Sequence, residues 1–89
     1  MIVDNMQIEN IYSLKPGYIA QIRLKNGNEY YGIVDYLDYC DGGVRLIDGY
    51  VYEVTIVGTV QKHFEEVFIK EDDVLCCMDK RPIIVYKND

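Results

Sequence analysis

The side chains with the clearest chemical capacity are carboxylates, which gather in two short segments far apart in the sequence. Asp38 and Asp41 lie in the first segment, and Glu71, Asp72 and Asp73 lie in the second. Hard divalent cations prefer clustered carboxylate ligands, and Asp38 with Asp72 and Asp73 would supply them. The spacing of an EF-hand calcium loop is missing. We therefore interpret both segments as solvated turns, and we predict no metal site.

The three cysteines are Cys40, Cys76 and Cys77. A zinc site needs about four ligands, and the chain adds only one histidine to this set. We interpret the vicinal pair as core and interface residues. An odd count with a vicinal pair is no disulfide framework, so the cysteines favour a reducing, cytoplasmic setting.

The remaining candidates for catalysis are weak. His63 has no serine or cysteine nucleophile near it in the sequence. Glu65 and Glu66 point to opposite faces of a strand, so they form no general acid and base pair. Gly42 and Gly43 lack the lysine and the helix of a phosphate-binding loop. We therefore predict that the protein is not an enzyme and uses no cofactor.

Alternation of apolar and polar residues indicates β-strands along much of the chain. Residues 18–25 alternate cleanly, and Asn26 followed by Gly27 is the strongest hairpin signal in the sequence. The next strand covers residues 29–37 and contains Gly32, which predicts a bulge or a sharp bend. Small barrels need such a corner to close.

The second half of the chain predicts three further strands, and the two carboxylate segments form the loops before the first and the third of them. These strands cover residues 44–56, 60–69 and 74–78. Asp48 and Gly49 mark a turn or bulge within the first, and Val67 and Ile69 are expected to face inward. Short strands joined by tight turns favour a sandwich or a small barrel.

The head of the chain predicts one or two turns of helix. Ile8, Ile11 and Tyr12 recur at i, i+3 and i+4, and Asn5 could cap the helix. Pro16 then ends it, because proline disfavours the α conformation for the residue before it.

We therefore expect a mainly β fold in which a short N-terminal helix precedes a five-stranded, strongly bent antiparallel barrel. The predicted parts are residues 1–17 as helix and lead-in, 18–79 as the barrel, and 80–89 as a tail, of which 83–86 could form an extra strand. The 89 residues carry a formal net charge of −6. A general nucleic-acid binder usually has a basic face, so any such contact must be local. We expect no signal peptide and no membrane-spanning segment.

The order of these signals resembles the Sm and Sm-like (LSm) family, which includes bacterial Hfq. The first motif of that family is a strand, an Asn-Gly-type hairpin, a bent strand containing glycine and a loop bearing an aspartate. Residues 24–38 read LKNGNEYYGIVDYLD, and Asp38 follows Gly32 at the family's spacing. The second motif is a strand, a turn and a short final strand, and residues 67–74 read VFIKEDDV. The resemblance spans residues 8–78 and implies an SH3-type barrel behind an N-terminal helix.

The resemblance also implies a homo-oligomeric ring of about five to eight subunits, joined by heterologous contacts that close on themselves. The fourth strand of one copy would pair with the fifth strand of the next. Such pairing satisfies the N–H and C=O groups that a small open sheet leaves at its edges.

Candidate RNA-contacting loops follow from the same resemblance. They contain Asp38, Tyr39, Cys40 and Gly42 in the first loop and Lys70 in the second. RNA-binding relatives have a stacking side chain and a base-reading asparagine at the positions of Cys40 and Gly42, and an arginine at Lys70. Gly42 offers no side-chain amide, and a lysine lacks the planar guanidinium of arginine. Tyr39 could stack on a base instead.

Arg23 and Lys25 could add a lateral rim that contacts phosphates, whereas the acidic loops oppose RNA. Three hypotheses stay open. The first is a ring that binds RNA weakly or with altered specificity, and the second is a structural or protein-interaction ring that has lost RNA binding and takes a basic partner. The third is a monomeric Tudor- or SH3-like barrel whose groove is lined by tyrosines. Those tyrosines are Tyr30, Tyr31, Tyr36, Tyr39, Tyr50 and Tyr52.

Overall fold

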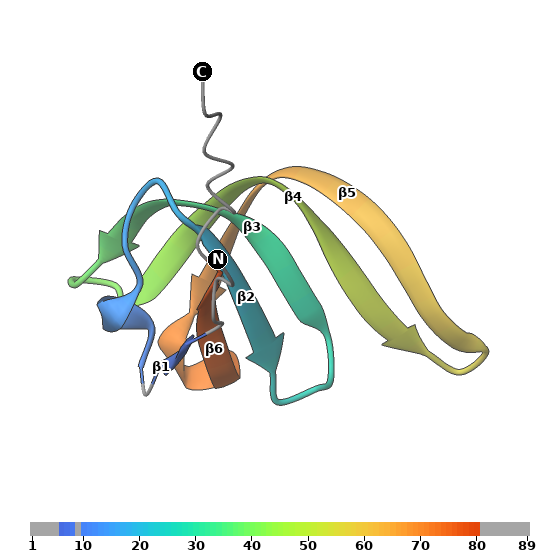
Figure 1. The fold of residues 1–89 in the computed structure, drawn as a ribbon. Helices are drawn as coiled ribbons and strands as arrows, with labels where there is room; N and C mark the ends of the chain where they lie inside the picture. Colours follow the sequence, from blue (N-terminus) through green and yellow to red (C-terminus); the bar gives the residue numbers. More distant parts are fainter. Residues whose placement is uncertain (1–5, 9, 81–89) are drawn as a thin grey trace, which may run out of the picture.

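The computed structural model of the protein describes residues 6–8 and 10–80, which form one antiparallel sheet (Figure 1). Its strands are β1 (Met6–Ile8), β2 (Ile19–Leu24), β3 (Glu29–Asp38), β4 (Gly43–Thr55), β5 (Gly58–Lys70) and β6 (Val74–Lys80). Two short 3₁₀ helices complete the fold, η1 (Ile11–Ser13) and η2 (Glu71–Asp73). The strand order is β1-β6-β2-β3-β4-β5. The predicted mainly β, antiparallel architecture is therefore confirmed.

The head of the chain differs from the prediction. Ile8 lies in β1, and the only helical turn of the described head is η1. The Asn10 side chain caps that turn by accepting the Tyr12 N–H at 2.9 Å, whereas Asn5 lies outside the described residues. Ile11 and Leu14, one turn apart, are both buried. One capped turn is enough to bury these two side chains, and the extended backbone at Leu14 ends it.

The Asn26 and Gly27 hairpin between β2 and β3 is confirmed. Gly27 has a φ of +97°, which a side chain would disfavour. The Asn26 side chain accepts the N–H of Asn28 at 2.9 Å, which is the local bond expected of asparagine in a turn. The turn thereby fixes the register of the β2–β3 pair, in which Ile22 lies opposite Tyr30.

Two glycines on neighbouring strands produce the bend of the sheet. The β3–β4 register shifts between Tyr31 and Ile33, and Asp48 adopts a φ of +52° opposite this point. A Cβ at Gly49 would lie 1.9 Å from the Tyr31 carbonyl oxygen and 2.7 Å from the Gly32 Cα. The two backbones can approach this closely only without side chains. The predicted bend at Gly32 and the predicted bulge at Asp48 and Gly49 are both confirmed.

The core lies inside this bend and draws on both ends of the described chain. Its buried members are Ile11, Leu14, Ala20, Ile22, Val34, Val44, Leu46, Ile69 and Cys77. Ile69 faces inward as expected, and Val67 packs against the core from a half-buried position. Leu14 and η1 cover one opening of the bent sheet, so the head contributes to the core although its helix is minimal.

The sheet is strongly bent but does not close into the predicted barrel. In the described part of the chain, β5 and β6 share no ladder, and β1 and β5 form the two edges. The paired β4–β5 ribbon extends well beyond β2 and β3 (Figure 1). Strands β4 and β5 have 13 residues each and β2 has only six, so the ribbon extends past its neighbours.

Strand β6 continues two residues past the predicted end at Met78. The extra strand proposed for residues 83–86 lies outside the described residues. The described residues contain no helix that is long and apolar enough to cross a membrane.

Candidate functional site

Two loops that are far apart in the sequence lie side by side at one end of the β4–β5 ribbon. Gly43 pairs with Lys70 at the end of that ladder. The Gly42 carbonyl oxygen then accepts the N–H of Glu71 at 2.9 Å. The structure thus brings Asp38, Gly42 and Lys70 together, as the two-motif interpretation requires.

The carboxylate of Asp38 organises the first loop. Its Oδ1 accepts the backbone N–H groups of Cys40 and Asp41, both at 2.9 Å, and its carbonyl oxygen accepts the N–H of Gly42 at 3.0 Å. Charged acceptors make strong hydrogen bonds to backbone amides. Asp38 therefore holds the backbone of the loop.

Tyr39 is stacked on a residue that the sequence did not single out for this site. Its ring lies 5.0 Å from that of Tyr12, centroid to centroid, with 22° between the planes. The Tyr12 hydroxyl donates to Glu71 Oε1 at 3.1 Å. Partial burial, and secondarily the Glu71 carboxylate, raise the pKa of Tyr12. Tyr39 itself is 71% exposed, so Tyr12 links both loops to η1 and supports an outward-facing ring.

No sequence pattern connects Tyr12 with Tyr39, because the contact depends on how η1 packs across the ends of the strands. The apolar spacing around Tyr12 indicated only that it belonged to a helical turn. Its hydrogen bond to Glu71 appears once the second loop is placed beside the first.

The joined loops carry mostly negative charge. The two loops contain five carboxylates and the exposed Lys70, and the carboxylates belong to Asp38, Asp41, Glu71, Asp72 and Asp73. Within residues 6–8 and 10–80, no three acidic, cysteine or histidine side chains gather closely enough to hold a metal ion. Cys40 is exposed at the same loop. The arrangement offers an acidic surface with one protruding aromatic ring.

Arg23 and Lys25 do not form a continuous basic rim. Arg23 donates from Nε to Glu29 Oε2 at 2.7 Å and also pairs with it through a second guanidinium nitrogen. Hydrogen bonding to Glu29 raises the pKa of Arg23. Lys25 is exposed, and its backbone N–H donates to the Asp73 carbonyl oxygen at 2.9 Å. The Arg23 guanidinium is therefore paired with a carboxylate of the chain, and Lys25 is the exposed cation that follows β2.

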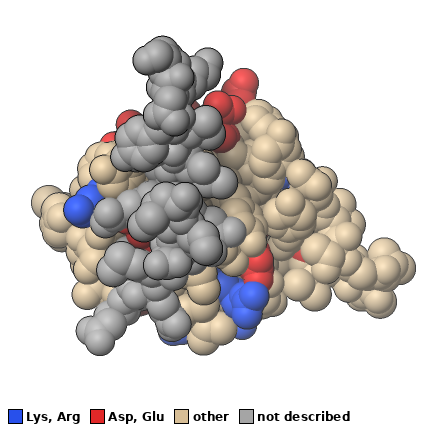
Figure 2. Space-filling view, viewed as in Figure 1, with Lys and Arg blue, Asp and Glu red and all other residues tan. Residues whose placement is uncertain are grey.

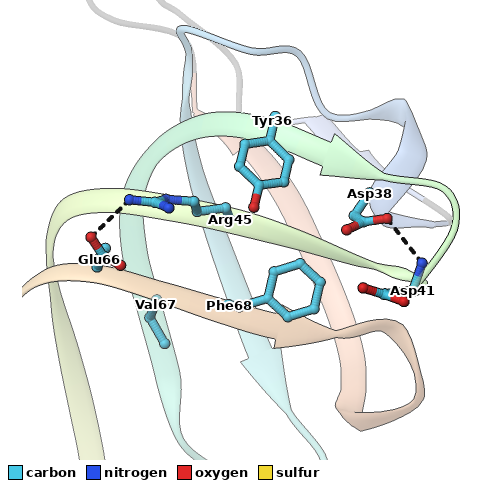
Figure 3. Close-up of a pocket in the computed structure, with 7 residues that line it drawn as sticks. All are labelled: Tyr36, Asp38, Asp41, Arg45, Glu66, Val67 and Phe68. Atoms are coloured by element: carbon cyan, nitrogen blue, oxygen red, sulfur yellow. Dashed lines mark hydrogen bonds and ion pairs between the residues drawn. The ribbon is translucent and has the colours of Figure 1, made fainter.

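A hollow of about 260 Å³ lies on the outer face of β3, β4 and β5 (Figure 3). Arg45 is its central cation. Its guanidinium lies 2.8 Å from Glu66 Oε2 and 3.3 Å from Asp35 Oδ2, and it stands 6.0 Å from the centroid of the Tyr36 ring. Figure 3 shows the guanidinium directed toward Glu66, with the Phe68 ring beside the hollow. The chain thus pairs this cation with two of its own carboxylates.

The other tyrosines of the predicted aromatic groove pack in pairs. Tyr31 and Tyr52 meet edge to face at 5.5 Å, and Tyr50 meets His63 in the same manner at 5.3 Å. An aromatic cage needs ring faces turned toward a shared space. Here Arg45 covers the face of Tyr36.

The outer edge of β5 has hydrogen-bonding groups that no described strand uses. Val54 lies opposite Thr59, and its N–H donates to the Asn28 side chain at 3.0 Å, away from β5. This pair is therefore a non-hydrogen-bonded pair, and the Thr59 backbone groups also point away from β4. The alternation of an antiparallel ladder directs Gln61 and His63 the same way.

The turn that joins β4 to β5 is apolar and unusually exposed. Ile56 is 105% exposed and Val57 is 93% exposed. Figure 2 shows no charged side chain at the protruding end of this ribbon. Long, unpaired strands with apolar neighbours are a common route to association between chains.

The opposite edge of the sheet is only partly covered. Strand β1 pairs with Cys77, Met78 and Asp79 of β6. Ahead of them, Leu75 is 60% exposed, beside a hollow of about 200 Å³. That hollow is lined by Asn10, Ile11, Glu71, Val74, Leu75, Cys76 and Cys77. Among the described residues, three of β1 therefore pair with the second half of β6 on its side away from β2, and no strand pairs with the first half on that side, where Leu75 is exposed.

A comparison with protein-family models and with the sequences of curated proteins found no match for this chain.

Proposed function

We propose that this chain is a non-enzymatic, Sm-like module that assembles with copies of itself into a closed ring. The observation that carries the proposal is the free outer edge of β5, which is 13 residues long and lies at the end of the sheet. Its outward backbone groups at Thr59, Gln61 and His63 form a template on which a strand from a second copy can pair.

The two edges of the sheet suit a contact between unlike surfaces. One copy contributes β5, and the next contributes the side of β6 away from β2, where no described strand pairs with Val74, Leu75 or Cys76 and Leu75 is exposed. A contact of this kind repeats from copy to copy, and it leaves no free edge only when the ring closes. The motif resemblance agrees with this choice. The fourth and fifth strands that it would join between copies are those expected at residues 60–69 and 74–78, which are β5 and β6 of the structure.

The charge of the acidic loops favours a ring that has no RNA site. Each copy would place five carboxylates and Lys70 at the joined loops, and a ring multiplies that charge. Phosphates would meet like charge there. A basic segment of a protein would instead find complementary charge, so we propose a partner of that kind. RNA binding of weak or altered specificity would depend on the exposed ring of Tyr39.

Native mass spectrometry of the full chain tests the assembly. The expected result is a closed species of about five to eight copies, each of 10.4 kDa. A monomer over the whole micromolar range would overturn the ring and favour a single barrel-like domain with a tyrosine-lined face.

Filter binding at low salt with U-rich and A-rich oligonucleotides tests the nucleic-acid part separately. We expect no retention of either. Retention that is lost in Tyr39→Ala but kept in Tyr36→Ala would return RNA to the ring as its ligand.

A further inference from the structure

The edge of β6 that assembly needs is already occupied in part by the chain's own β1. Met6 lies opposite Asp79, Gln7 opposite Met78, and Ile8 opposite Cys77. One side of a strand can pair with only one neighbour at each position. A second copy's β5 and this chain's β1 therefore compete for the same backbone groups of β6.

We propose that β1 is a displaceable guard strand, and that β5 of a second copy replaces it on β6 during assembly. This inference rests on the proposed function, because it names the step by which the β5 edge finds its partner. It adds a form of regulation to the edge pairing, because the chain limits its own assembly until β1 leaves β6.

The lengths of the two competitors favour exchange. Strand β1 has three residues and β5 has 13. A three-residue strand at an edge is held by few hydrogen bonds, and such edges open readily. A longer strand makes more bonds to the same partner and covers more of its side chains.

The residues that follow β1, and not β1 itself, hold the head of the chain against the core. Ile11 and Leu14 are buried in the core at 1% and 2% exposure, and Asn10 caps η1. Strand β1 can therefore leave β6 while η1 stays packed. Displacement does not require the core to unfold.

The uncovered part of β6 gives the incoming strand its first contact. Val74, Leu75 and Cys76 lie beyond the end of β1, beside the hollow of about 200 Å³. The exposed Leu75 side chain offers apolar area there. From this start, antiparallel pairing of β5 would proceed toward Cys77 and remove β1 one residue at a time.

A reversible covalent lock tests the competition. Ile8 lies directly opposite Cys77, so Ile8→Cys places two cysteines at the separation that a disulfide accepts. The background carries Cys40→Ser and Cys76→Ser, which leaves one pairing. After oxidative refolding and a mass check for the bond, we expect mainly monomer, and reduction should restore the assembly of the background chain.

A second variant changes the guard strand in the opposite direction. Ile8→Pro removes a backbone N–H of β1 that faces β6, because Ile8 and Cys77 form a hydrogen-bonded pair of the ladder, and Ile8→Ala is the matched control. We expect Ile8→Pro to assemble at a concentration about tenfold lower, equivalent to about 1.4 kcal/mol, while the control resembles the parent chain.

The outcomes separate the two proposals. If the parent assembles and the locked and proline variants assemble equally well, β1 is no guard and the ring proposal stands. If neither the parent nor any variant assembles, both proposals fall. If the lock does not form, equal assembly of Ile8→Pro and Ile8→Ala alone contradicts the guard strand.

Discussion

Single residues in this chain divide into those that hold backbone and those that face outward. Asp38 uses one carboxylate oxygen to fix two amides of its loop, and Arg45 is held between Asp35 and Glu66. Tyr39 and Cys40 at the same loop are exposed. Residue types that suggest ligand chemistry in the sequence thus serve the fold in several cases, whereas an aromatic ring, a thiol and most charged groups of the two loops are exposed.

Because the thiol of Cys77 is buried, we expect the free energy of unfolding to fall at alkaline pH. Burial, and secondarily its neighbour Cys76, raise the pKa of Cys77 from 9.0 to about 11. Below pH 9 the thiol is neutral in both states and contributes no pH dependence. Between pH 9 and 11 the unfolded thiol ionises while the folded one does not, so the free energy of unfolding falls by about 1–2 kcal/mol.

Urea denaturation at pH 8, 9, 10 and 11 measures this fall. Cys77→Ala should be less stable at every pH because it leaves space in the core, but its loss between pH 9 and 11 should be smaller. Cys40→Ala is the control, since its thiol is exposed. Equal slopes for all three chains would contradict the assignment to Cys77.

At the scale of elements, the bend depends on a close approach between β3 and β4. Gly49→Ala would place a Cβ 1.9 Å from the Tyr31 carbonyl oxygen, a backbone atom that cannot rotate away. At Gly32 the nearest contact is the Phe64 ring at 3.0 Å, and that side chain can shift. We expect Gly49→Ala to cost about 3 kcal/mol, at the upper end for overpacking, and Gly32→Ala to cost less. Urea denaturation of both variants checks the order, and a milder effect at Gly49 would contradict this account of the bend.

Elements that depend on local chemistry could be predicted from the sequence. The Asn26 and Gly27 turn, the bend at Gly32 and the bulge at Gly49 each need a residue type that the sequence displays. The tertiary elements could not be predicted in this way. Strand β1 exists because β6 offers it an edge, and the helical spacing around Ile11 is satisfied by one 3₁₀ turn.

The candidate site shows the same division. Spacing alone placed Asp38 and Lys70 in two loops that the structure brings together. The contact between Tyr12 and Tyr39 depends on the packing of η1, and no pattern in the neighbouring sequence predicts it. The rim expected of Arg23 and Lys25 is interrupted because Glu29, an unremarkable strand residue in the sequence, lies directly opposite Arg23.

At the scale of the whole molecule, the sheet has two unlike edges and a ribbon longer than its own fold requires. The core lies around η1, β2 and the ends of β4 and β5 nearest the loops, whereas the part of the ribbon toward Ile56 buries little. A long exposed strand edge is open to uncontrolled pairing with other chains. The proposed pairing between copies would cover this edge, which the single chain leaves exposed.

One substitution at the β5 edge separates assembly from folding. The Gln61 N–H points away from β4, so Gln61→Pro removes a group that only a neighbouring chain would use, and proline is tolerated at edge strands. We expect the proline chain to keep the free energy of unfolding of the monomer unit, measured in urea, within about 1 kcal/mol and to lose the ring in native mass spectra, while Gln61→Ala keeps both. A ring that persists in Gln61→Pro at the parent's concentration would show that β5 does not join the copies, because an edge cannot extend its ladder through a position that lacks the donor.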